Sequence, residues 1–100
     1  MAKLRVSAEA RRDLERIGAI GVEEHGPVAA AAYLEGFRRF FGLLGEQPYA
    51  GQARPELGPN IRSLSHRPYR FLYRLDGDTV IIDRIIHQAR DVARALREEQ

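Results

Sequence analysis

The sequence of 100 residues contains no cysteine and only one lysine. Without cysteine the chain has no disulfide, no thiolate metal ligand and no cysteine nucleophile, which fits a reducing cytoplasm. Lys3 stands beside 15 arginines, and 16 basic against 14 acidic residues give a formal net charge of +2. Arginine suits two-point contacts with phosphate or carboxylate. The alanines and glycines that accompany it equally fit the codon bias of a GC-rich genome.

Long apolar runs are also missing. The longest, Val28 to Leu34, is seven residues, far short of the roughly 20 that a membrane-spanning helix needs. Residues 1–6 lack the apolar stretch of a secretory signal. A hydrophobic fraction of 44% is typical of globular proteins, and the length supports one modest core. We therefore expect residues 1–100 to form a single cytoplasmic domain that does not enter a membrane.

The motifs of several enzyme classes are absent. No glycine-rich phosphate loop precedes a helix, and Ser7, Ser63 and Ser65 lack the context of a nucleophile elbow. The three histidines are too far apart in the sequence to match a local metal motif. The sequence therefore predicts neither a metal nor a cofactor.

The apolar pattern changes period along the chain. A strand pattern over residues 3–6 is followed by Ser7, which can cap a helix, and then by helical spacing of apolar residues. His25-Gly26-Pro27 separates this helix from a second one. Residues 45–60 hold three glycines and three prolines and are predicted to form a long surface loop. Three strand patterns and a short final helix pattern then cover residues 61–65, 69–75, 79–87 and 90–97.

This order of elements predicts an α+β fold. We expect an N-terminal strand, an antiparallel helical hairpin, then a three-stranded antiparallel meander forming one sheet, and a short C-terminal helix. Asp76-Gly77-Asp78 supplies the turn of the last strand pair, because glycine tolerates positive φ. In the middle strand aromatic residues alternate with arginines, so the rings are expected in the core and the arginines in water.

The second helix carries more apolar surface than one stripe. One apolar line includes Phe37 and Phe41, and an overlapping line includes Tyr33, Phe37 and Phe40. Such a helix is either packed between two layers or offers its second face to a partner. Tyr33, Phe37 and Phe40 are therefore candidate partner-binding residues.

The stretch from Ile61 to Leu75 contains no acidic residue. Its basic residues are His66, Arg62, Arg67, Arg70 and Arg74. A basic stretch of this kind can bind phosphate groups. It can equally be a solvated face or a contact surface for an acidic partner, and the sequence leaves these interpretations open.

His87 ends the last strand pattern, three residues before Arg90. A histidine and an arginine at a strand end can serve as the acid–base group and the phosphate-binding group of RNA cleavage. They can also bond to Asp83 or Asp91 and hold the C-terminal segment. We favour the structural role and keep the catalytic one as an alternative.

Three segments, taken in order, resemble toxins of the RelE/ParE superfamily: residues 4–14, 68–74 and 85–91. The resemblance spans nearly the whole chain and implies a helical hairpin packed on an antiparallel sheet. Its RelE-like branch cleaves messenger RNA on the ribosome, and Arg70 and Arg90 fall where that branch keeps catalytic arginines. His87 matches the histidine of a sub-branch that ends in a His-Tyr pair.

Two departures set the chain apart from the RelE-like branch. Leu96 stands where that branch has a catalytic tyrosine, and Gln88 replaces the tyrosine of the His-Tyr pair. General acid–base catalysis contributes about 10²–10⁴-fold to a rate. A chain without the acid–base tyrosine is at best a poor nuclease. The nuclease interpretation is therefore only the alternative, and its catalytic residues would be Arg70, His87 and Arg90.

The ending His87-x-x-Arg90-Asp91 resembles the ParE-like branch. That resemblance implies a toxin that binds and poisons DNA gyrase without enzymatic chemistry and without sequence-specific binding of nucleic acid. It also implies a cognate antitoxin, a DNA-binding dimer whose C-terminal segment wraps the toxin. The predicted partner-binding residues are Tyr33, Phe37, Phe40, Arg62, Arg67, Arg70, Arg74, His87 and Arg90. The alternatives are a ribosome-dependent endoribonuclease and an inactive member that only binds antitoxin.

Overall fold

The computed structural model describes residues 2–89. Strand β1 (Lys3–Val6) precedes two helices, α1 (Ala8–His25) and α2 (Pro27–Glu46). Four further strands follow: β2 (Gln52–Ala53), β3 (Ile61–His66), β4 (Tyr69–Asp76) and β5 (Thr79–His87), with a 3-10 turn, η1 (Pro55–Leu57), between β2 and β3. No helix within residues 2–89 has the length and hydropathy needed to span a membrane.

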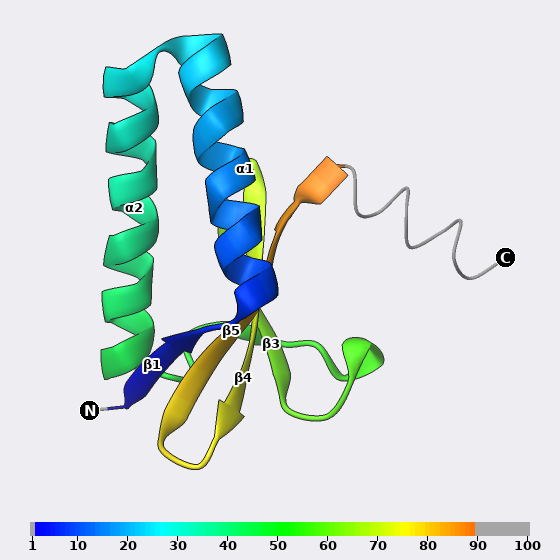
Figure 1. The fold of residues 1–100 in the computed structure, drawn as a ribbon. Helices are drawn as coiled ribbons and strands as arrows, with labels where there is room; N and C mark the ends of the chain where they lie inside the picture. Colours follow the sequence, from blue (N-terminus) through cyan, green and yellow to red (C-terminus); the bar gives the residue numbers. More distant parts are fainter. Residues whose placement is uncertain (1, 90–100) are drawn as a thin grey trace, which may run out of the picture.

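The molecule has two layers, a helical hairpin and one sheet (Figure 1). The strand order is β1-β5-β4-β3-β2, and β1 runs parallel to β5 while all other neighbours are antiparallel. The end of the hairpin that carries the connection between α1 and α2 lies away from β1 and from the β4–β5 turn (Figure 1). Part of both helices therefore extends beyond the central strands (Figure 1).

The fold prediction is wrong in its strand count. The two helices and the β3–β4–β5 meander are present, but the sheet has five strands, because β2 forms inside the predicted 45–60 loop. The sheet is also mixed, because β1 pairs in parallel with β5. Strand β2 pairs Gln52 with Ser63 and Ala53 with Arg62. Two exposed residues are too few to show a period-2 pattern in the sequence. The predicted C-terminal helix over residues 90–97 lies outside the described residues.

The ends of the two helices follow from local chemistry. Ser7 has extended backbone angles, and its Oγ accepts the Ala10 N–H at 3.0 Å, which confirms the predicted cap of α1. Gly26 joins the helices with φ 87°, a value that L side chains rarely adopt. Pro27 then begins α2, where its missing N–H is not needed.

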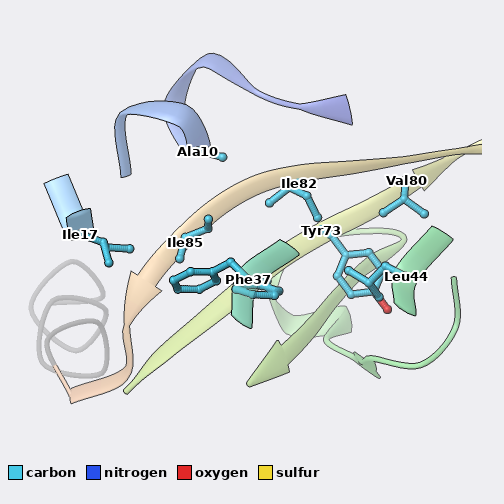
Figure 2. Packing of buried hydrophobic residues seen from close by; sticks show 9 residues of the cluster. Ala10, Ile17, Phe37, Leu44, Tyr73, Val80, Ile82 and Ile85 are labelled. Carbon is cyan, nitrogen blue, oxygen red and sulfur yellow. The ribbon is translucent and has the colours of Figure 1, made fainter. Parts of the chain in front are cut away.

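The core lies between the two helices and the helix-facing side of β4 and β5, with Ala10 and Ile17 of α1 among its residues (Figure 2). Phe37 of α2 packs on Phe71 of β4 with ring centroids 5.0 Å apart. Tyr73 is fully buried, yet its hydroxyl accepts the Gly51 N–H at 2.8 Å and donates to the Pro48 carbonyl at 2.9 Å. Burial raises the pKa of Tyr73. The core therefore also anchors the loop that follows α2.

The edge of β5 is completed by side chains where β1 ends. Strand β1 pairs with β5 only as far as Ile82. Beyond that point the Ser7 Oγ donates to the Asp83 carbonyl at 2.9 Å, and the Asp13 carboxylate accepts the Ile85 N–H at 2.9 Å. Asp13 is 3% exposed and also accepts the Arg84 Nε at 2.9 Å. One carboxylate on α1 thus satisfies a buried backbone donor and a guanidinium at the same time.

Candidate functional site

A groove runs between the helical hairpin and the end of the sheet where β4 begins and β5 ends. Its volume is about 370 Å³. We call it the hairpin groove; among its lining residues are Ile17, Ile20, Ala29, Tyr33, Tyr69 and His87. Most of these side chains are apolar, while Glu24, His25 and His87 add polar groups. The groove is therefore an apolar cleft with a polar fringe, as expected of a binding surface.

Three rings lie in a row across the sheet beside this groove. The strand register pairs His66 of β3 with Tyr69 of β4, and Tyr69 with His87 of β5, all on the helix-facing side. The Tyr33 ring stacks on His66 with centroids 4.6 Å apart. The Tyr33 hydroxyl donates to the carbonyls of His66 and Arg67, at 3.0 and 2.8 Å. Tyr33 therefore ties α2 to the β3–β4 turn and forms one wall of the groove.

Tyr33 makes the stability of the protein sensitive to high pH. Burial, and to a smaller degree the neighbouring Tyr69, raises the pKa of Tyr33 from 10.0 to about 12. Folding favours the neutral phenol, so its contribution is complete below about pH 10 and is lost as the pH rises toward about 12. We expect the melting temperature of the wild type to fall more steeply above about pH 10 than that of Tyr33→Phe. Equal slopes in a pH series of thermal melts would contradict this assignment.

His66 packs tightly against a glycine of α2. A Cβ built on Gly36 would lie 2.7 Å from the His66 Nε2, and the ring is held by Tyr33, Phe37 and Phe40. We expect Gly36→Ala to lower the free energy of unfolding by about 1–3 kcal/mol, as an overpacked core does. A Cβ added to the exposed Gly42 of the same helix would have no neighbouring atom within 4 Å. Gly42→Ala is the control and should raise stability by about 0.5–1 kcal/mol, measured by urea denaturation.

The three aromatic residues predicted on a partner face have different environments. Phe37 is 1% exposed and belongs to the core, so the prediction that it offers surface to a partner is corrected. Phe40 is half-buried and packs on His66 and Phe71. Tyr33 is half-buried and lines the groove. Both apolar lines of α2 include Phe37, which packs on Phe71 of β4. The wide apolar surface of α2 is therefore covered mainly by the sheet.

The predicted basic stretch does not form one surface. Arg70 and Arg74 lie on the face of β4 away from the helices, and Arg74 pairs with Asp83 at 3.1 Å. Arg62 shares the opposite face with its cross-strand neighbour Tyr73 and donates to the Gly51 carbonyl at 2.7 Å. Arg67 is exposed in the turn between β3 and β4. Arg90 lies outside the described residues. The arginines of the acid-free stretch are thus divided between the two faces of the sheet and the β3–β4 turn.

The alternative catalytic residues do not converge. Tyr69 of β4 pairs with His87 of β5, so these two side chains lie on the same face of the sheet. Arg70 follows Tyr69 in β4 and pairs with Ile86, so its side chain lies on the opposite face. His87 packs edge-on against the Tyr69 ring, with centroids 5.3 Å apart. Its Nδ1 and the His66 Nε2 are buried without a hydrogen-bond partner in residues 2–89. Arg70 and His87 therefore do not share a site on this sheet.

Other chemistry is also limited in the described part of the chain. Within residues 2–89, no three histidine or carboxylate side chains lie close enough to hold a metal ion. Sequence reasoning missed Asp13, although its position between Ala10 and Ile17 on the buried side of α1 is a readable signal. It also missed the groove residues Ile20 and Ala29, which flank the helix connection.

Comparison with known proteins places this geometry in a family. The family described as "ParE toxin of type II toxin-antitoxin system, parDE" matches residues 4–92. Toxin ParE3 of Caulobacter vibrioides is 34% identical over 84 residues, which cover 84% of either chain.

Two solved structures share the fold. A chain of the chromosomal ParDE TA system from P. aeruginosa has a TM-score of 0.76 at 26% identity, covering 87% of this chain and 96% of its own. A chain of the toxin-antitoxin complex RelBE2 from Mycobacterium tuberculosis has a TM-score of 0.60 at 33% identity, covering 86% and 96%. Fold and sequence agree across nearly the whole length, and the chain belongs to the ParE family of type II toxin–antitoxin toxins.

Proposed function

We propose that the chain is a growth-inhibiting toxin that binds and poisons DNA gyrase in the cytoplasm and is neutralised by a cognate antitoxin. The observation that carries this proposal is the placement of Arg70 and His87 on opposite faces of the sheet. Binding to gyrase needs no such convergence, whereas cleavage of RNA by these residues does. The whole chain then acts as one toxin domain and uses neither a metal nor a cofactor.

The hairpin groove is the surface that we assign to the antitoxin. Its apolar wall from Ile17, Ile20 and Ala29 and its aromatic wall from Tyr33 and Tyr69 suit an amphipathic segment that inserts apolar side chains. A segment that folds on binding can cover such an extended cleft. This assignment fits the solved relatives, which are a ParDE toxin–antitoxin system and a RelBE2 toxin–antitoxin complex.

A second candidate is a ribosome-dependent endoribonuclease of the RelE-like branch, favoured by the likeness to the RelBE2 complex. Arg70, His87 and Arg90 are its catalytic residues, with Arg90 outside the described part. An inactive member that only binds antitoxin is the third candidate. The three differ in what happens when the chain is expressed without antitoxin.

Expression in cells that carry a DNA-damage-inducible reporter separates these functions. Gyrase poisoning leaves broken DNA, so we expect growth arrest with reporter induction and intact messages. Co-expression of the cognate antitoxin should reverse both effects. Arrest with new message ends in primer extension and a silent reporter would replace the proposal with the nuclease, and normal growth would favour the inactive member.

A further inference from the structure

One face of the sheet is not covered by the helical hairpin. The helices pack on the other face, where they meet the core residues of β4 and β5 (Figure 1). Side chains alternate between the two faces along a strand. Because Phe71 and Tyr73 of β4 belong to the core, Arg70, Leu72 and Arg74 lie on the uncovered side. We call this side of the sheet the open face.

Strand β1 adds another arginine to the open face. Leu4 and Val6 pack against the core, so Arg5 between them lies on the open face, where it is exposed. Arg5 and Arg74 are both register partners of Ile81 in β5. Their backbones are therefore two strand spacings apart, or about 10 Å. The sheet thus brings together arginines that are far apart in the sequence.

Most of the charge around the open face is balanced. The charged side chains on it within residues 2–89 are Lys3, Arg5, Arg70, Arg74, Asp76, Asp83 and Arg84, with Arg54, Glu56 and Asp78 at its borders. Arg54, Arg74 and Arg84 each form an ion pair with one carboxylate. Lys3 and Asp76 are both register partners of Thr79, beside the β4–β5 turn.

Two arginines of the open face are left without a carboxylate. Within residues 2–89, neither Arg5 nor Arg70 forms an ion pair or a side-chain hydrogen bond. The carboxylates of Asp76 and Asp78 lie at the β4–β5 turn, and Arg70 is six residues, or about 20 Å of strand, from Asp76. The part of the open face from Arg5 to Arg70 is therefore positively charged and suits an acidic partner.

The side chains beside these arginines favour a protein segment over a nucleic acid. Leu72 and Ile86, the register partner of Arg70, are half-buried aliphatic residues of the open face and offer apolar contact to a partner. Binding of single-stranded nucleic acid uses aromatic rings that stack on bases. The aromatic residues of β4 pack on the helix-facing side instead. Arginine also binds carboxylates through two parallel hydrogen bonds. The fitting ligand is an acidic segment that carries apolar side chains.

The open face and the hairpin groove lie on opposite sides of the sheet. The groove uses Tyr69 and His87, which are register partners on the helix-facing side. Arg70 follows Tyr69 directly and lies on the other side. A segment bound in the groove therefore leaves Arg5 and Arg70 uncovered.

We propose that the open face binds the growth-inhibition target through an acidic protein segment, whose carboxylates pair with Arg5 and Arg70 and whose apolar side chains contact Leu72 and Ile86. The inference rests on the proposed function, because it leaves the groove to the antitoxin and gives the target the opposite side of the sheet. Association through complementary charge is fast at low salt and weakens as salt screens it.

The test measures binding of purified full-length variants to gyrase and to antitoxin by surface plasmon resonance. Arg5→Ala and Arg70→Ala should each raise the dissociation constant for gyrase by about 10-fold or more, the effect of losing a hydrogen bond to a charged group. The double variant should lose about 100-fold, since distant sites add. Its gyrase binding should also depend less on salt than that of the wild type. Antitoxin affinity and melting temperature should stay at the wild-type values.

Arg38→Ala is the matched control for loss of one exposed arginine. Arg38 lies in α2, is exposed and does not line the groove, so its replacement should leave both affinities unchanged. Arg5→Lys keeps the charge and should bind gyrase more tightly than Arg5→Ala. A separate titration with a DNA duplex, without gyrase, checks the phosphate alternative.

Unchanged gyrase binding by the double variant would overturn the inference while leaving the proposed function in place. A loss of antitoxin affinity in the double variant would also overturn it, since the open face would then hold antitoxin. Duplex binding that both substitutions weaken would assign the arginines to phosphate groups instead.

If wild-type toxin neither binds nor inhibits gyrase but arrests growth, the proposed function fails and growth arrest becomes the readout. Arg5 belongs to none of the catalytic alternatives, so its replacement separates target binding from catalysis. In that case Arg5→Ala must weaken the arrest for the inference to stand, and full arrest would contradict it.

Discussion

Replacing Asp13 with alanine is expected to lower the free energy of unfolding by about 1–3 kcal/mol, the usual effect of leaving a buried hydrogen-bond donor without its partner. The carboxylate is 3% exposed and accepts the Arg84 Nε and the Ile85 N–H, both at 2.9 Å. Its loss leaves a backbone donor at the β5 edge without a partner and removes the ion pair with Arg84. A domain of this size has a total stability of about 5–15 kcal/mol, so the variant should melt far below the wild type.

Asp83→Ala is the matched control for Asp13→Ala. Asp83 also accepts an arginine, Arg74, at 3.1 Å, but the two side chains are 30% and 42% exposed. A solvent-exposed ion pair contributes about 0–1 kcal/mol. Urea denaturation of both variants should therefore separate them clearly. Equal losses would mean that the Asp13 carboxylate does not complete the β5 edge as described.

Filling the hairpin groove should abolish antitoxin binding without unfolding the toxin. Ala29 lines the groove and is exposed in the first turn of α2, where a carboxylate is favourable. In Ala29→Glu the side chain occupies the groove beside Glu24, and docking of an apolar segment would bury its charge without a partner. We expect the dissociation constant of the antitoxin to rise by about 100-fold or more.

Ala31→Glu is the control for the groove variant. Ala31 is exposed two residues further along α2 and does not line the groove. Its substitution has the same charge and nearly the same helix position, so antitoxin affinity should remain at the wild-type value. Thermal melts should show both variants folded. Normal antitoxin binding by Ala29→Glu would mean that the antitoxin binds another surface of the toxin.

Much of the fold follows from local patterns in the sequence. The alternation from Tyr69 to Leu75 and the β-branched run after Asp78 correctly indicated β4 and β5, and Ser7 correctly indicated the start of α1. The features that the sequence did not predict depend on contacts between segments far apart in the chain. Strand β1 lies beside β5, its neighbour in space but not in sequence, and β2 is too short to have a period. The residue that completes the β5 edge, Asp13, acts across 72 positions.

The candidate site was less predictable, for physical reasons. Apolar spacing places Tyr33 and Phe37 on one line of α2, but only the position of the sheet decides that Phe37 is buried and Tyr33 lines the groove. The arginines share one stretch of sequence, yet the β3–β4 register directs Arg62 and Arg74 to opposite faces.

Binding to gyrase, rather than cutting of RNA, is the activity that we propose for this chain. The most direct measurement is supercoiling of relaxed plasmid by purified gyrase with increasing wild-type toxin, with and without antitoxin. We predict dose-dependent loss of supercoiling that antitoxin reverses. Full supercoiling at excess toxin, together with cleavage of translated messages by the same preparation, would contradict the proposal.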